Sequence, residues 1–147
     1  MSAAVDEDPP LRHVRQPLPH DSAVKHVQGA ALYIDDMPEP EGTLHLAIGG
    51  APAARGRLVA VDLAAVRAAP GVVAVLAAGD VPGRNDISPA KGDEPAFAET
   101  EVLFHGQPVF AVVAGTRDAA RRAARLGRIE VDAERPSVTV EDALERG

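Results

Sequence analysis

The sequence predicts an α+β domain with a mixed sheet and two to three short helices. Segments with strand-like patterns outnumber helical ones, and the two kinds do not alternate regularly enough for parallel crossovers. A chain of 147 residues is long enough for one domain that buries about 68–70% of its unfolded surface. Apolar residues make up 46% of the chain and aromatic ones only 3%, which indicates a mainly aliphatic core.

The first 20 residues predict an extended, mobile N-terminal arm. They are rich in proline and lack apolar periodicity, so burial offsets little of the entropy lost on ordering. Residues 21–147 are expected to form the domain. Apolar residues become more frequent between Val24 and Ile34, and the acidic, proline-rich stretch 35–42 then predicts a loop.

Two strands are expected next. Leu44, Leu46 and Ile48 alternate with other residues, which is the pattern of a half-buried strand, and Gly49-Gly50 ends it. Residues 57–62 predict the second strand.

A short helix and a third strand follow. Asp62 is a suitable cap for a helix that runs to Ala69, and Pro70-Gly71 ends that helix. The continuous apolar run Val72–Leu76 is typical of a strand covered on both faces.

Residues 82 to about 98 predict a long loop, because three prolines and two glycines interrupt any periodicity. Loops of this length in compact domains are usually functional or disordered. Strands are then expected at 102–104 and 108–114. Thr116 as cap and Gly127 as stop favour a helix over 117–126. A strand near Ile129 and a last short helix over 140–145 complete the order.

Composition excludes several classes of function. A net charge of −7 argues against nucleic-acid binding, which needs a positive face. The chain has no cysteine, so it offers no disulfide, thiolate nucleophile or iron–sulfur ligand. No apolar run approaches the roughly 20 residues that span a bilayer. The acidic N-terminus differs from a secretory signal, so we expect a cytoplasmic protein without membrane contact.

No catalytic, cofactor-binding or metal-binding residues are predicted from the residue patterns. Gly49-Gly50 with Gly56 lacks the lysine of a phosphate-binding loop and favours a strand-ending turn. The acidic run after Ile34 lacks calcium-loop spacing and favours a solvated turn. The histidines show no metal-ligand spacing on a helix and favour surface or capping roles; they are His13, His20, His26, His45 and His105.

A stripe of arginines is expected along the helix at 117–126 and just after it. Arg117, Arg121, Arg125 and Arg128 recur at helical spacing, which places like charges on one face. Water is the favoured explanation for how this repulsion is relieved. Acidic groups from a neighbouring element or a partner subunit are the alternative.

Three segments together resemble the α/β hammerhead domain that opens the molybdenum-binding subunit of xanthine dehydrogenases and aldehyde oxidases. They are residues 17–20 with 29–38, residues 66–76, and residues 106–114, and the similarity extends from about residue 16 to the end of the chain. The resemblance implies a fragment of a larger oxidoreductase that hydroxylates purines, as in purine catabolism, or aldehydes. Water supplies the oxygen in that reaction.

The resemblance also implies cofactors and partners. Molybdopterin-bound molybdenum, iron–sulfur clusters and FAD belong to the full assembly, and none is expected to be bound by this piece. The family's catalytic and cofactor-binding residues lie downstream of this domain, so the piece alone is expected to be inactive. Its expected partners are the remaining molybdenum-binding domains of the same subunit and the iron–sulfur/flavin subunit.

The long loop aligns with a family segment that borders the funnel leading to the molybdenum. The substrate-funnel candidates are Ile87, Ser88, Pro89, Ala90 and Lys91. A stand-alone acidic module that binds a protein partner through this loop, without enzymatic activity, is the alternative function.

Overall fold

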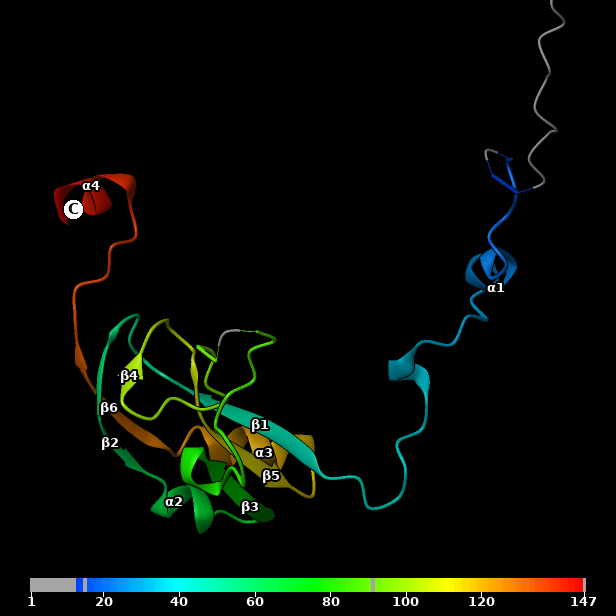
Figure 1. Ribbon diagram of the computed structural model, residues 1–147. Helices are drawn as coiled ribbons and strands as arrows, with labels where there is room; N and C mark the ends of the chain where they lie inside the picture. The colour runs from blue at the N-terminus through cyan, green and yellow to red at the C-terminus, as the bar shows by residue number, and fades with distance from the viewer. Residues whose placement is uncertain (1–12, 15, 91, 147) are drawn as a thin grey trace, which may run out of the picture. The chain divides into compact units, whose positions relative to one another are not determined.

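The computed structural model describes residues 13–14, 16–90 and 92–146 (Figure 1). The chain divides into two units, the first ending at Glu39 and the second beginning at Pro40. Within the first unit, a short helix α1 (Ala23–Val27) and a 3-10 helix η1 (Ile34–Asp36) are formed. Most of the predicted N-terminal arm lies outside the described residues, so that expectation stays a prediction.

The second unit contains two three-stranded sheets, and every strand pair is antiparallel. One sheet has the order β1 (His45–Gly50), β5 (Pro108–Ala114), β3 (Val72–Ala77). The other has the order β4 (Glu101–Val102), β2 (Gly56–Asp62), β6 (Arg128–Ala133). The helices are α2 (Ala64–Arg67), α3 (Arg117–Ala124) and α4 (Val140–Arg146), with a 3-10 helix η2 (Ala78–Asp80) after β3. The predicted α+β class is confirmed, and its strands form two antiparallel sheets.

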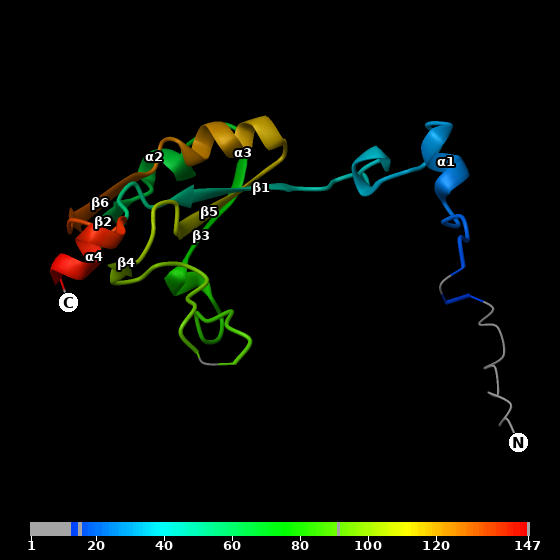
Figure 2. The same cartoon turned by 90° about the horizontal axis from the view of Figure 1, so that it is seen from above.

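Helix α3 covers one face of the β1-β5-β3 sheet (Figure 2). Thr116 caps the helix, because its hydroxyl oxygen accepts a hydrogen bond from the Ala119 amide at 3.1 Å. Ala119, Ala120 and Ala123 form the buried side of the helix. Because these side chains are small, the helix lies close against Ala47 and Ala114.

Phe110 is the largest fully buried side chain among the described residues, and it lies in the central strand β5. Two glycines leave room for its ring. A Cβ atom at Gly49 would lie 2.1 Å from Phe110, and one at Gly127 would lie 2.4 Å away. The aromatic ring therefore occupies space that any other residue at these two positions would need.

Strands β1 and β3 differ from the sequence predictions in the faces they bury. The predicted strand at Leu44–Ile48 is present, but the leucines and Ile48 are exposed, while Ala47 and Gly49 face α3. The prediction that the Val72–Leu76 strand is covered on both faces is wrong for this chain, since β3 is an edge strand with Val73 exposed.

The other elements lie close to their predicted positions. Strands β2, β5 and β6, and helices α2, α3 and α4, all overlap the predicted ranges. Strand β4 is limited to Glu101–Val102, so the expected extension to Phe104 is wrong. The described part of the chain contains no helix long and apolar enough to span a membrane.

Candidate functional site

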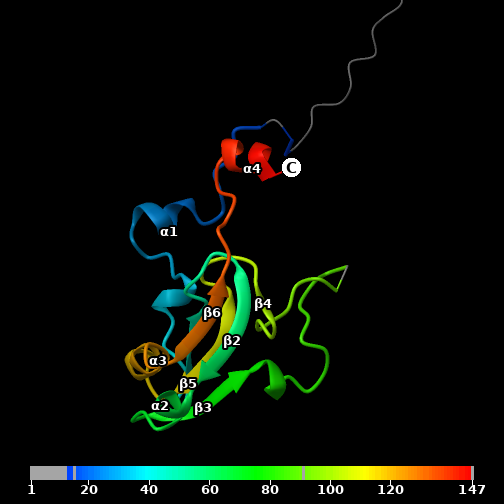
Figure 3. The same cartoon turned by 90° about the vertical axis from the view of Figure 1, so that its left-hand side faces the viewer.

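The loop between η2 and β4, residues 81–100, carries the residues predicted to border a substrate funnel. It extends to the side of the β1-β5-β3 sheet opposite α3 (Figures 2 and 3). The described residues of this loop form neither helix nor strand, as predicted. Its conformation is fixed by hydrogen bonds within the loop.

Asn85 and Phe97 close the base of the loop, and we call this pair the neck. The Asn85 side-chain amide donates to the Phe97 carbonyl at 2.6 Å, and the Phe97 amide donates to Asn85 Oδ1 at 2.9 Å. Asn85 Nδ2 also donates to Glu99 Oε1 at 2.9 Å. The Asn85 side chain thus makes two hydrogen bonds with the Phe97 backbone, one as donor and one as acceptor, as a neighbouring strand would. These bonds hold the two ends of the loop together.

Asp86 and Ser88 organise the loop beyond the neck. Asp86 Oδ1 accepts from the Ser88 amide at 3.0 Å and from the Ser88 hydroxyl at 2.7 Å. The Ser88 hydroxyl oxygen in turn accepts from the Gly92 amide at 2.6 Å. The Ile87 amide donates to the Glu94 carbonyl at 2.9 Å. This set of bonds folds the loop back on itself without help from another element.

The hydrogen bonds donated by the Ser88 hydroxyl and then by the Ser88 amide lower the pKa of Asp86 below its ordinary value of 3.8. The charge of Arg84, whose guanidinium lies 3.7 Å from Asp86 Oδ2, and a backbone hydrogen bond from Glu94 act in the same direction. Partial burial opposes them, but the lowering effects are larger. Asp86 is therefore ionised in the folded loop at neutral pH.

The order of the loop is expected to decrease at acid pH. Because the folded pKa is depressed, the ionised Asp86 stabilises the loop fully above pH 3.8, and this contribution is lost as the pH falls through the lower folded value. Hydrogen exchange of the Ser88 and Gly92 amides, corrected for intrinsic rates, should show less protection at about pH 3 than at about pH 6. In Asp86→Asn, the change with pH should be smaller. Equal changes in both proteins would contradict the role given to Asp86.

The structure separates the five funnel candidates into different environments. Ile87, Pro89 and Ala90 are exposed, and Ile87 has 68% of its surface accessible. Ser88 is half-buried, and its hydroxyl is engaged by Asp86 and Gly92. Lys91 lies outside the described residues. The loop thus presents an apolar outer surface, while the hydroxyl serves its internal order.

A hollow of about 250 Å³ lies between the loop and the strand that follows it. Its lining includes Asn85, Glu99, Glu101 and Gln107. Gln107 is buried, and its side-chain Oε1 accepts from the Leu103 amide at 2.7 Å. Neither Asn85 nor Gln107 was predicted from the sequence to be a positioning residue. The sequence signals for Gln107 are its place beside Gly106 at a strand start and its membership of the family-like segment 106–114.

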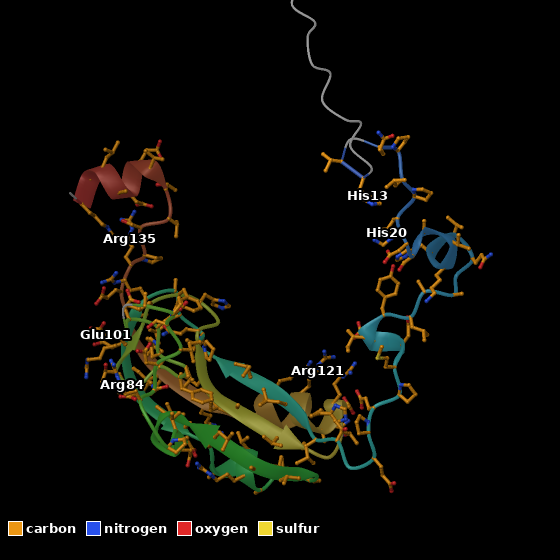
Figure 4. All side chains as sticks on the ribbon, turned by 45° about the vertical axis from the view of Figure 1, so that its right-hand side comes forward. His13, His20, Arg84, Glu101, Arg121 and Arg135 are labelled. Carbon is orange, nitrogen blue, oxygen red and sulfur yellow. The ribbon has the colours of Figure 1, made fainter. Side chains whose placement is uncertain are left out.

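The histidines, which were not predicted to bind a metal ion, belong to different parts of the chain. Among the described residues, no three histidine, aspartate or glutamate side chains are grouped so that they could hold a metal ion. His13 and His20 belong to the first unit (Figure 4). His26 Nδ1 lies 2.8 Å from the Tyr33 hydroxyl in the same unit. In the part of the chain that the structure describes, this donor set does not fit a molybdenum or iron–sulfur site.

Of the four arginines predicted to form a stripe, Arg117 and Arg121 lie on α3 and are exposed, and Arg121 is labelled in Figure 4. Arg125 follows the last helical residue, and Arg128 is the first residue of β6, so the prediction of one helix face carrying all four is wrong. Arg122, outside the predicted stripe, pairs with Asp118 one turn earlier. Within the described part of the chain, Arg121 and Arg125 make no ion pair with an acidic side chain. Relief of their repulsion by water or by acidic groups of a partner subunit stays a prediction.

Comparison with known proteins identifies relatives that share most of this chain. A model of the family "Aldehyde oxidase and xanthine dehydrogenase, a/b hammerhead domain" matches residues 28–135. A xanthine dehydrogenase/oxidase of Gallus gallus is 37% identical over 90% of this chain and 10% of its own length. Aldehyde oxidase 4 of Mus musculus is 37% identical over 99% of this chain and 11% of its own.

Solved structures of oxidoreductases are also similar to most of this chain. The aldehyde oxidoreductase from Desulfovibrio desulfuricans is 28% identical, with a TM-score of 0.75, over 86% of this chain and 15% of that one. The reconstituted CO dehydrogenase from Oligotropha carboxidovorans is 28% identical, with a TM-score of 0.72, over 83% of this chain and 15% of that one. The chain spans about a tenth of the length of the curated relatives it matches.

Proposed function

Since the chain belongs to the aldehyde oxidase and xanthine dehydrogenase family, whose a/b hammerhead domain it matches over residues 28–135, we propose that it supports the reaction centre of a molybdenum hydroxylase. The resemblance inferred from the three sequence segments is confirmed. In the proposal, the full assembly oxidises a purine or an aldehyde with oxygen from water. This chain positions neighbouring domains and borders the path of the substrate.

The self-ordered loop carries the proposal. Its neck and the Asp86–Ser88–Gly92 bonds hold an exposed apolar surface at Ile87, Pro89 and Ala90 in a defined place. A fixed backbone with apolar side chains suits contact with the ring faces of a purine or the carbon skeleton of an aldehyde, because ligand sites are lined mainly by apolar groups. The described groups supply neither a metal-ligand cluster nor a cysteine, so molybdopterin, iron–sulfur clusters and FAD would be held by other parts of the assembly.

The chain's own contribution to the reaction is therefore steric and positional. Ordered loop side chains exclude some substrate shapes and admit others, whereas proton and electron transfer fall to groups outside this chain. We propose that the 147-residue chain is inactive alone. A reading frame that continues into cofactor-binding sequence supports this role, and a stop codon after Gly147 favours the stand-alone protein-binding module.

Replacing residues 87–91 with a Gly/Ser linker of equal length that keeps serine at position 88 should change substrate selection in the full-length enzyme more than stability. We expect KM for the bulkier substrates to shift by about tenfold, with a small change in melting temperature, because the apolar wall is removed while the neck remains. Steady-state kinetics with a purine and an aldehyde series measures this effect.

A matched control is the same replacement at residues 134–138, an exposed connection between β6 and α4. This variant should retain the parent KM. If the loop variant changes only thermal stability, residues 87–91 have a structural role and the funnel proposal is wrong.

A further inference from the structure

A hollow of about 480 Å³ lies between the edge strand β1 and the end of helix α3. This size is within the range of small-molecule sites in proteins. Gly49, Gly50 and Gly127 contribute to its lining, with the Phe110 ring at its base. Because glycine has no side chain, a ligand in the hollow can approach the backbone closely at these positions.

Two arginines supply the charge of this hollow. Among the described residues, Arg121 and Arg125 are its only charged lining residues, and no carboxylate lines it. They are four residues apart, and Arg125, the C-cap residue, keeps helical backbone angles, so the two side chains start from the same side of α3. Both are exposed, and Arg121 is labelled in Figure 4. Within the described ranges, neither makes an ion pair with an acidic side chain.

The positive charge of this pair exceeds what the helix end needs. The C-terminal end of a helix carries about half a negative elementary charge, which two guanidinium groups more than neutralise. The neighbouring Arg122 differs from the pair, because it is matched by Asp118. An anion bound between Arg121 and Arg125 would offset their mutual repulsion.

The remaining lining indicates what else a ligand of this hollow contains. Ile48, Ala124 and Ile129 contribute apolar side chains to it. Ile48 is exposed and the other two are half-buried, so all three offer surface to a ligand. An inorganic anion would leave this apolar surface uncovered, whereas a ligand with an apolar body would bury part of it. The hollow therefore suits an organic anion.

We propose that this hollow binds an organic phosphate monoester, whose phosphate lies between Arg121 and Arg125 and whose apolar body lies on the β1 side. Two guanidinium groups match the charge of about −1.5 to −2 that a monoester carries at neutral pH, and their N–H groups donate in pairs to phosphate oxygens. A carboxylate has a single charge and matches the pair less well. The hollow lies on the α3 side of the sheet, opposite the 81–100 loop (Figure 2), so the proposal is independent of the proposed function.

Titration of the isotope-labelled chain with phenyl phosphate, followed by NMR at about pH 7.5, tests this proposal, because the monoester is then mainly dianionic. We expect saturable shifts of the Gly49, Gly50 and Gly127 amide resonances, with a Kd below about 1 mM. Inorganic phosphate lacks the apolar body and benzoate lacks the second charge, so each should bind at least about fivefold more weakly. Equal affinity for either of these two probes, or no shift at the three glycines, would overturn the proposal.

Arg121→Gln and Arg125→Gln should each weaken phenyl phosphate binding by at least about fivefold, since each removes charged hydrogen bonds to the phosphate. Arg128→Gln is the matched control, because it makes the same charge change at an exposed residue that does not line the hollow. Its Kd should stay within about twofold of the parent value at about 0.15 M salt. The ligand-free spectra verify that all three variants are folded. Equal weakening in all three would show a general attraction to positive surface and would overturn the assignment of the site.

Discussion

Replacing Phe110 with alanine should lower the free energy of unfolding of the chain by about 3–5 kcal/mol. The ring is fully buried at the centre of β5, and neighbouring glycines at 49 and 127 have no side chains that could fill the vacated space. The loss therefore combines transfer of the ring to water with a cavity that collapses poorly. Chemical denaturation followed by circular dichroism measures the change.

Phe110→Leu is the matched control, since it keeps most of the apolar volume and should cost less than Phe110→Ala. Phe104→Ala is a second control, because Phe104 is 55% exposed and lies just before the same strand. If Phe104→Ala destabilises the chain as much as Phe110→Ala, Phe110 does not have the central packing role assigned to it.

Gly49→Ala should destabilise the chain through overpacking, by at least about 1–3 kcal/mol. The new Cβ would lie 2.1 Å from the Phe110 ring, far inside van der Waals contact, and both residues are in paired strands that restrict movement. Thermal unfolding of the variant and the parent measures the effect. Gly79→Ala provides the matched control, because nothing lies within 4 Å of its new Cβ and its stability should be nearly unchanged.

A double-mutant cycle identifies the cause of the Gly49→Ala effect. In a Phe110→Leu background, the same alanine should cost less, because the smaller side chain leaves room for it. An unchanged cost in that background would show that the loss arises from backbone conformation and not from contact with the ring.

Much of the fold was predictable because local patterns agree with the final packing. Thr116 caps α3 through its side-chain oxygen, as its position in the sequence indicates. Asp62 Oδ1 accepts from the Ala64 amide at the start of α2, although the N-cap residue of that helix is Leu63. The Pro108–Ala114 strand coincides with the predicted one, since its continuous apolar run suits a central strand. In these elements, the interactions that fix the structure lie within a few residues of one another.

The face of β1 was not predictable in the same way. Alternation defines which residues share a face, but it does not say which face this domain covers. Gly49 and Ala47 face α3 because the thin alanine side of the helix and the Phe110 ring need small partners there. That requirement links residues more than 60 positions apart, and no local pattern encodes it.

Loop length and family resemblance located the candidate site in the sequence. The hydrogen bonds that order the loop were not predictable from them. Asn85 and Phe97 are separated by 11 residues, and nothing in their spacing indicates that one side chain pairs with the other's backbone. Ser88 was proposed as a funnel residue, yet its hydroxyl stabilises the loop internally. Long-range hydrogen bonds of this kind depend on the folded path of the chain.

The neck has a consequence for how this domain tolerates sequence change. Because Asn85 and Phe97 fix the distance between the two ends, insertions or deletions between them need not shift the register of β3 or β5. The segment can be exchanged as a cassette while the rest of the domain stays as it is. Under the proposed funnel role, grafts of this segment from relatives would change substrate selection on a constant scaffold.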